Sequence, residues 1–324
     1  MSLLHVANGH ATTGLIELSS VPGRTMVWCD PLYDGPVPGN VSEEELLRLR
    51  AAFLASSDED VDDVTADLRN WRTAIDQQDY DELVLWYEHD LFDQLNLVQI
   101  LTHIGRARLS RPVTLVSVDA FPGHPDFKGI GELEPADMPA LFEMRRSISD
   151  AQIALAGRAW RSYRSADPRE IEALLSTDTS PLPYLARALR RHLEEFPSAA
   201  NGLSKSEQRL MEQALHGPAD LRRAFPRMHD GERGYYITDG SFVDRAHELA
   251  NSSPALVRLR TEAGDARSFP KGEFELTPAG RDVLAGSADR LRLCGIERWL
   301  GGVHLSGHGP AWRWSHENER LILS

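Results

Sequence analysis

The sequence lacks the features that mark secreted and membrane-spanning proteins. It has only two cysteines, Cys29 and Cys294, which lie far apart and show no metal-type spacing. No apolar run approaches the roughly 18 residues that a membrane-spanning helix requires. The first residues, MSLLHVANGH, lack the basic segment and apolar core of a signal peptide. These absences predict a protein of a reducing, cytoplasmic compartment with no membrane partner.

Basic side chains are scarce in the first part of the chain. Residues 1–200 carry 18 basic and 32 acidic side chains, whereas residues 201–324 carry 17 of each, so the whole net charge of −14 falls in the first part. An acidic surface repels a phosphate backbone. A nucleic-acid partner is therefore disfavoured by charge, although the sequence does not exclude one.

Short apolar runs alternate with helical patterns over residues 1–130. The sequence predicts strands at 3–8, 25–30, 83–87 and 112–118, with helices between them. Such alternation is typical of parallel strands that are joined by crossover helices. We therefore expect a Rossmann-like α/β domain in this segment.

The rest of the chain predicts helices and then a winged helix. Apolar residues recur every three or four positions over residues 131–200, which indicates a helical linker region. Residues 201–324 are expected to form a winged-helix-like domain with a tail rich in Trp, Gly and His. In that tail a Gly-Gly turn between RWL and VHL favours a hairpin with buried tryptophans over an exposed aromatic surface.

Polar residues follow the predicted strands of the first domain. In an open parallel sheet, ligands bind beyond the carboxyl ends of the strands, so segments far apart in sequence are expected to meet in one crevice. The fourth strand is followed by Asp119. The candidate site residues that follow the other three strands are Asn8, Gly9, Asp30, Asp34, Glu88, His89, Asp90 and Asp93.

Two interpretations apply to the polar group after the third strand. Glu88, His89 and Asp90 place an acid, an imidazole that titrates near neutrality and a second acid together, which suits acid–base catalysis. Alternatively, Asp90 is the N-cap of the following helix, and Asp93 is favoured there by the helix dipole. Neither role excludes ligand contact, because a helix N-terminus is also where ligands bind.

A divalent metal ion is a further alternative. Asp30, His89, Asp90 and Asp93 offer oxygen and nitrogen ligands that suit Mg²⁺, Mn²⁺, Fe²⁺ or Zn²⁺. No HxH, HExxH or CxxC spacing accompanies them. The identity of any cofactor therefore stays open beside metal-free acid–base chemistry.

Several blocks of the sequence resemble a known bacterial family. LHVANG, VWCDPLYDGPVP, LWYEHDLFDQLNLVQIL, GLSKSEQRLMEQAL and RWLGGVHLSG are similar to blocks of the family described as domain of unknown function 1835. The resemblance covers essentially the whole chain, and EHDLFDQL is its most distinctive block. It implies the two-part organisation and the crevice, and it brings no activity or substrate with it.

The sequence leaves two classes of function open. The first is an enzyme or ligand-binding protein that acts on a small polar or nucleotide-like molecule, by hydrolysis or group transfer. The second is a regulatory or interaction module whose winged helix contacts DNA or a protein partner, which Arg222, Arg223 and Arg227 favour. Homodimerisation is compatible with both.

Overall fold

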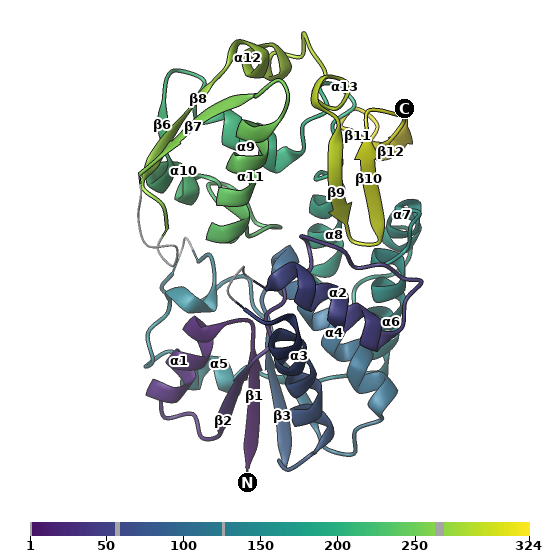
Figure 1. The fold of residues 1–324 in the computed structure, drawn as a ribbon. Helices are drawn as coiled ribbons and strands as arrows, with labels where there is room; N and C mark the ends of the chain where they lie inside the picture. Colours follow the sequence, from purple (N-terminus) through teal and green to yellow (C-terminus); the bar gives the residue numbers. More distant parts are fainter. Residues whose placement is uncertain (1, 56–58, 125–126, 263–268) are drawn as a thin grey trace. The chain divides into compact units, whose positions relative to one another are not determined.

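The computed structural model describes residues 2–55, 59–124, 127–262 and 269–324. These residues form two compact units (Figure 1). The first unit comprises Met1–Ala188 with Gly301–Val303, and the second comprises Leu189–Leu300 with His304–Ser324. The helices that follow the α/β segment, up to Ala188, thus belong to the first unit.

The first unit is built on a five-stranded sheet in the order β2-β1-β3-β4-β5. Strands β1 to β4 are parallel, and the two-residue strand β5 pairs antiparallel with β4 at the edge. The predicted Rossmann-like parallel sheet is therefore confirmed. The strands are β1 (Leu3–Ala7), β2 (Arg24–Val27), β3 (Glu82–Trp86), β4 (Val113–Val116) and β5 (Arg146–Ser147).

Helices cover both faces of this sheet. Helices α1 and α5 and the turn η1 pack on one face, whereas α2, α3 and α4 lie on the other (Figure 1). Helix α6 packs against α4, and α8 continues from the first unit into the second. The helices are α1 (His10–Leu18), α2 (Glu43–Leu54), α3 (Val61–Asp76), α4 (Leu91–Ala107), η1 (Ile130–Glu132), α5 (Met138–Glu143), α6 (Asp150–Tyr163), α7 (Arg169–Leu175) and α8 (Leu185–Leu193).

Strand alternation places one set of side chains on the face that α1, η1 and α5 cover. Ala7, Val84, Trp86 and Val116 come from three neighbouring strands and join one buried apolar cluster there. Successive strand residues point to opposite faces, so Glu88, two positions beyond Trp86, is directed toward the same side as that cluster. The core thus sets the direction of the first polar residue beyond β3.

The second unit contains a winged helix. Three helices and a three-stranded antiparallel sheet follow in the order α9, β6, α10, α11, β7, β8, and the sheet order is β6-β8-β7. This arrangement confirms the predicted winged-helix-like domain. Its elements are α9 (Lys205–Glu212), β6 (Ala219–Asp220), α10 (Leu221–Arg227), α11 (Asp239–Asn251), β7 (Val257–Thr261), β8 (Gly272–Leu276) and α12 (Pro278–Leu284).

The tail forms two hairpins. The predicted turn at Gly301 and Gly302 joins β9 (Ile296–Leu300) to β10 (Val303–Gly307), after the short helix α13 (Arg290–Cys294). A second hairpin pairs β11 (Trp312–Ser315) with β12 (Arg320–Leu323). The described helices include none that is long and apolar enough to cross a membrane.

A buried carboxylate connects the winged helix to the tail. Glu207 on α9 closes a capping box with Ser204 and lies 3.2 Å from Arg290 and 2.7 Å from Arg298. Burial alone would raise the pKa of Glu207, but these two guanidinium groups outweigh burial and hold the pKa well below its usual range. The stability from this carboxylate is therefore present above the ordinary pKa of 4.5 and is lost as the pH falls through the lower, folded-state pKa.

We expect Glu207→Gln to lower the free energy of unfolding by roughly 3 kcal/mol at pH 7, because two buried guanidinium groups then lose a shared partner. Urea unfolding followed by circular dichroism measures this change. Glu212→Gln, at an exposed position of the same helix, is the control and should unfold like the parent. Equal stability of the two variants would contradict a buried charge network at Glu207.

Candidate functional site at the strand ends

The candidate site lies where the chain changes direction across the sheet. From β1 the chain runs to β2 on one side and later returns to β3 on the other side of β1. The connections that leave the carboxyl ends of β1 and β3 therefore diverge, which makes this the topological switch point where open α/β sheets bind ligands. Asn8 follows β1 directly, and Glu88 follows β3 by two residues.

Asp93 connects the three elements that meet at this point. It lies in the first turn of α4, and its side chain is fully buried. One carboxyl oxygen, Oδ2, accepts hydrogen bonds from the backbone N–H of Glu88 (2.8 Å) and from Nδ2 of Asn8 (3.1 Å). Thr12 in turn donates to Oδ1 of Asn8 (3.0 Å). The other carboxyl oxygen of Asp93, Oδ1, is buried and has no hydrogen-bond partner among the residues that the structure describes.

The Glu88 carboxyl group is enclosed between β3 and the turn η1. It accepts hydrogen bonds from the backbone N–H of Ile130 and from the side chain of Asn8. An added Cβ at position 129 would lie 2.7 Å from Oε2 of Glu88, so any larger residue there would displace the Glu88 carboxyl group. The backbone of this segment thus approaches the carboxyl group closely and leaves the Glu88 side chain almost buried.

This environment favours the protonated form of both acids. Burial, followed by the charge of Asp90, raises the pKa of Glu88 to about 8, although the hydrogen bonds from Ile130 and Asn8 oppose that shift. Burial also raises the pKa of Asp93 well above its usual range, and the carboxyl groups of Asp90 and Glu88 add to this effect. Two acids that share a poorly solvated site cannot both ionise easily, so at least one proton is retained near neutral pH.

Asp90 is the N-cap of α4. Its side chain accepts the backbone N–H of Asp93 at 3.1 Å, as the helix-cap interpretation predicted. The capping oxygen and the partly exposed position of Asp90 do not exclude a second role toward a ligand. Asp90 is also the charge that most strongly reinforces the effect of burial on Glu88.

His89 has different neighbours from Glu88. Its ring nitrogen Nδ1 lies 3.4 Å from the carbonyl oxygen of Val118, and its ring meets Tyr184 edge-on with 6.2 Å between centroids. Tyr184 donates a hydrogen bond to Asp119 at 3.2 Å, so His89 lies beside the polar group that follows β4. These contacts of His89 are therefore with residues other than those around Glu88.

Asp30 is occupied by a buried ion pair. Arg50 on α2 donates to the Asp30 carboxylate from Nε (3.0 Å) and Nη2 (2.5 Å), and both side chains are almost fully buried. The same guanidinium group binds the carbonyl oxygens of Asp34 (2.6 Å) and Pro31 (3.2 Å). The backbone of Asp30 also exchanges two hydrogen bonds with Asn96 of α4. Asp30 and Asp34 thus fix the loop after β2, and a ligand-binding role for them stays a prediction.

The ends of β2 and β3 meet around Cys29. Burial and the carboxylates of Asp30 and Asp93 raise the pKa of Cys29 to about 11, so the thiol is not a nucleophile at neutral pH.

On the β1 side, Gly9 forms the turn into α1, and its carbonyl oxygen accepts the N–H of Thr13 at 3.2 Å. The structure therefore brings Asn8, Glu88 and Asp93 into one hydrogen-bonded group and leaves Asp30, Asp34 and His89 in neighbouring groups.

The geometry gives no support to the metal alternative. Among the described residues, no group of three or more His, Cys, Asp and Glu side chains is arranged to hold a metal ion. Asp30, one of the four proposed ligands, is also held by Arg50. The identity of any cofactor stays open.

Some residues of this region could not be found from the sequence pattern. Gly129, Tyr184 and Arg187 lie in segments far along the chain, where nothing marks them as neighbours of the third strand. The burial of Arg50, in contrast, could have been predicted from the sequence. Arg50 stands at a helical position spaced for burial, three and four residues beyond Leu47 and Leu46, and a buried guanidinium group requires an acidic partner.

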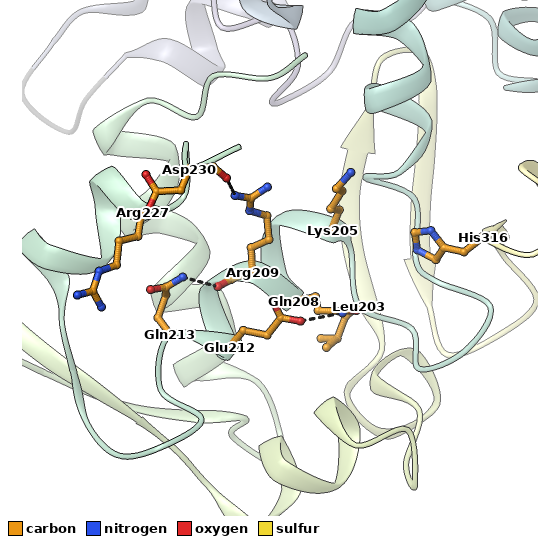
Figure 2. Close-up of a pocket in the computed structure, with 9 residues that line it drawn as sticks. All are labelled: Leu203, Lys205, Gln208, Arg209, Glu212, Gln213, Arg227, Asp230 and His316. Atoms are coloured by element: carbon orange, nitrogen blue, oxygen red, sulfur yellow. Dashed lines mark hydrogen bonds between the residues drawn. The ribbon is translucent and has the colours of Figure 1, made fainter. Parts of the chain in front are cut away.

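The second unit has cavities of its own. One of about 470 Å³ lies along α9, and side chains of both charges surround it (Figure 2). Its lining residues are Leu203, Lys205, Gln208, Arg209, Glu212, Gln213, Arg227, Asp230 and His316. Much of this charge is neutralised locally, because Lys205 pairs with Glu194, and Arg209 lies 3.6 Å from the carboxylate of Glu232.

The helix of the winged helix that usually enters a DNA groove carries acidic groups. On α11, Asp239 and Asp244 are exposed, whereas the Glu248 carboxylate pairs with Arg245 and Arg298. Carboxylates on this surface repel phosphate groups. The residues that the structure describes on α11 therefore do not favour DNA binding in the usual orientation.

The chain matches no family model and no curated protein. Among solved structures, the ORC1 protein of Aeropyrum pernix in complex with DNA is similar over 88% of this chain and 78% of that chain, at 14% identity and a TM-score of 0.21. A likeness of this size supports no statement about activity or partners. What is established is the class of protein: an α/β protein with a parallel sheet and a winged helix.

The ion pair at the end of β2 predicts a strong dependence of stability on Arg50. We expect Arg50→Leu to lower the free energy of unfolding by roughly 3–5 kcal/mol, because it leaves the Asp30 carboxylate buried without a counter-ion. Adding Asp30→Leu should recover most of this loss. Chemical denaturation of the single and the double variant measures both effects, with Arg48→Leu at an exposed position of α2 as the control. A cost for Arg50→Leu no greater than that of the control would contradict the assignment.

The raised pKa of Glu88 predicts a pH-dependent gain in stability for Glu88→Gln. The parent is most stable with a neutral Glu88, so its stability falls as the pH rises from the ordinary pKa of 4.5 through about 8. The amide of Glu88→Gln is neutral at every pH. The variant should therefore become more stable than the parent as the pH rises over that range, by roughly a few kcal/mol of unfolding free energy, as expected for a pKa shift of this size. Thermal melts from pH 4 to 9 measure it, with the exposed Glu134→Gln as control. A pH-independent difference would show that Glu88 titrates normally.

Proposed function

We propose that this protein is an enzyme that binds a small polar molecule at the switch point between β1 and β3 and acts on it by hydrolysis or group transfer. The observation that supports the proposal is the buried acid pair Glu88 and Asp93, which favours a retained proton at this point of the sheet. Acids with raised pKa values cluster at functional sites.

Glu88 is the group that exchanges a proton with the substrate. In its neutral form it donates a proton to the leaving group, and the carboxylate that results then takes a proton from water or from an acceptor hydroxyl group. Glu88 begins and ends the cycle protonated, so the protons balance in both hydrolysis and group transfer. A pKa of about 8 suits this cycle near neutral pH, because the two protonation states are close in free energy there.

Asp93 and Asn8 are positioning residues for Glu88. Asp93 is fully buried and binds the backbone N–H of Glu88, whereas Asn8 donates to Asp93 and contacts the Glu88 carboxyl group. His89, one residue further, contributes an imidazole on a neighbouring side of the site. Membership of the family described as domain of unknown function 1835 is part of the same proposal, and it adds no reaction.

A metabolite library screened by thermal shift, followed by turnover assays on the compounds that stabilise the protein, tests this proposal. We expect Glu88→Gln to bind the same compounds and to lose turnover by about 10²–10⁴-fold, the usual contribution of a general acid–base group. Glu134→Gln should retain turnover. Asn8→Ala should shift the alkaline limb of the pH–rate profile toward higher pH, because it removes a hydrogen bond that lowers the pKa of Glu88.

Undiminished turnover in Glu88→Gln would overturn the assignment of Glu88. Binding of duplex DNA at physiological salt that is lost in Arg222→Ala/Arg223→Ala, together with no stabilising compound, would instead favour the regulatory alternative.

A further inference from the structure

Partnerless polar atoms in the first unit occur at the carboxyl end of the sheet. Among its described residues, the buried side-chain nitrogen and oxygen atoms without a hydrogen-bond partner are Oδ1 of Asp93 and Nε and Nη2 of Arg187. Buried donors and acceptors are nearly always paired in folded proteins. A donor pair without partners, close to the candidate site, therefore calls for an explanation.

Other arginines of the same unit show how a structural guanidinium group is satisfied. Arg50 donates from Nε, Nη1 and Nη2 to the Asp30 carboxylate and to two backbone carbonyl oxygens. Arg164 likewise donates from all three nitrogens, to Glu43 and to the carbonyl oxygens of Pro38 and Val41. Arg187 differs, because the Nε and Nη2 groups form no such bond with the described residues.

Arg187 lies beside the residues that flank His89. The guanidinium carbon is 5.7 Å from the centre of the Tyr184 ring, and the same ring meets His89 edge-on. Nη2 lies 3.8 Å from Oδ2 of Asp119, which follows β4, while Tyr184 donates to the other oxygen of Asp119. The separation of 3.8 Å keeps the charges near one another without a hydrogen bond, so Asp119 orients Arg187 and leaves the two donors unused.

The two unused donors form one edge of the guanidinium plane. The N–H bonds of Nε and Nη2 run parallel along that edge and match the two oxygens of a planar carboxylate. The Arg187 side chain as a whole is 39% exposed although Nε and Nη2 are buried, so binding through these two donors requires the guanidinium group to turn toward the ligand. Because Asp119 already stands beside this cation, a dianionic phosphate would meet more repulsion at this position than a singly charged carboxylate would.

We propose that Arg187 is a specificity-determining residue that binds a carboxylate group of the substrate, on the His89 and Tyr184 side of the site. The inference rests on the proposed function, since it places the substrate between Arg187 and Glu88. It narrows the substrate class to small carboxylic acids whose reacting group lies at a distance from the carboxylate.

Titration with acetate and glycolate, against chloride at equal ionic strength, tests this inference by thermal shift. We expect both carboxylates to raise the melting temperature of the parent, and inorganic phosphate to do so less. Arg187→Gln should weaken the apparent carboxylate affinity by at least about tenfold, because it removes a charged, bidentate contact. Arg190→Gln, an exposed position on the same helix that removes the same charge, should respond like the parent.

Arg187→Lys separates the shape of the donor from its charge. It retains the charge near Asp119 and lacks the parallel donors, so we expect an affinity between those of the parent and of Arg187→Gln. If Arg187→Gln does not fold, the lysine variant decides the test, and a response equal to that of the parent would overturn the inference. A stronger response to phosphate, or no response to either carboxylate, would also overturn it.

The Glu88→Gln variant distinguishes failure of this inference from failure of the proposed function. It should keep the carboxylate response, because Glu88 is not part of the anion contact. Loss of the Arg187 effect with normal dependence of turnover on Glu88 would leave the proposed function standing. A carboxylate response that depends on Arg187, together with turnover that does not depend on Glu88, would indicate a carboxylate-binding site that does not serve the proposed reaction.

Discussion

The buried carboxyl group of Asp93 is the constraint on which the site depends. It holds the backbone of Glu88 and the side chain of Asn8 from within the first turn of α4, so the ends of β1 and β3 and the start of the helix keep one geometry. A fully buried acid is costly unless it is protonated or compensated. Among the residues that the structure describes, Asp93 receives two hydrogen bonds and pairs with no cation, so its charge is poorly compensated and the whole group favours the neutral state.

The buried acids beyond β2 and β3, the two strands on either side of β1, have opposite environments. Beyond β2, Arg50 compensates Asp30 fully and the result is a rigid loop. Beyond β3, Glu88 and Asp93 have an amide and backbone N–H groups as partners, and burial raises both pKa values. The first arrangement stabilises the fold through a charge pair, whereas the second retains a proton that can be transferred. In the proposed function, this difference distinguishes a structural acid from a reactive one at the carboxyl end of the same sheet.

Local patterns in the sequence predicted much of the fold. Alternating apolar runs gave the parallel sheet, and the Gly-Gly turn gave the tail hairpin, because strand periodicity and turn chemistry act over a few residues. Helix α3 was not predicted as a separate helix, because most of its residues are polar. Asn8, Glu88 and Asp93 were candidates through their position after strands. The sequence did not separate Asp30 from them, because the distinction depends on Arg50, which only the packing of α2 brings near. Arg187 and Gly129 depend on long-range packing in the same way.

The protonation state of Glu88 tests the central claim most directly. Carboxyl carbons labelled with ¹³C report the charge of each acid by NMR, and the Glu88→Gln variant identifies the Glu88 signal in a titration from pH 3 to 10. We predict a neutral Glu88 carboxyl group at pH 7, with a midpoint near the pKa of about 8 that burial and Asp90 impose. A midpoint near the ordinary value of 4.5 would show an ionised, solvated glutamate and would contradict the account.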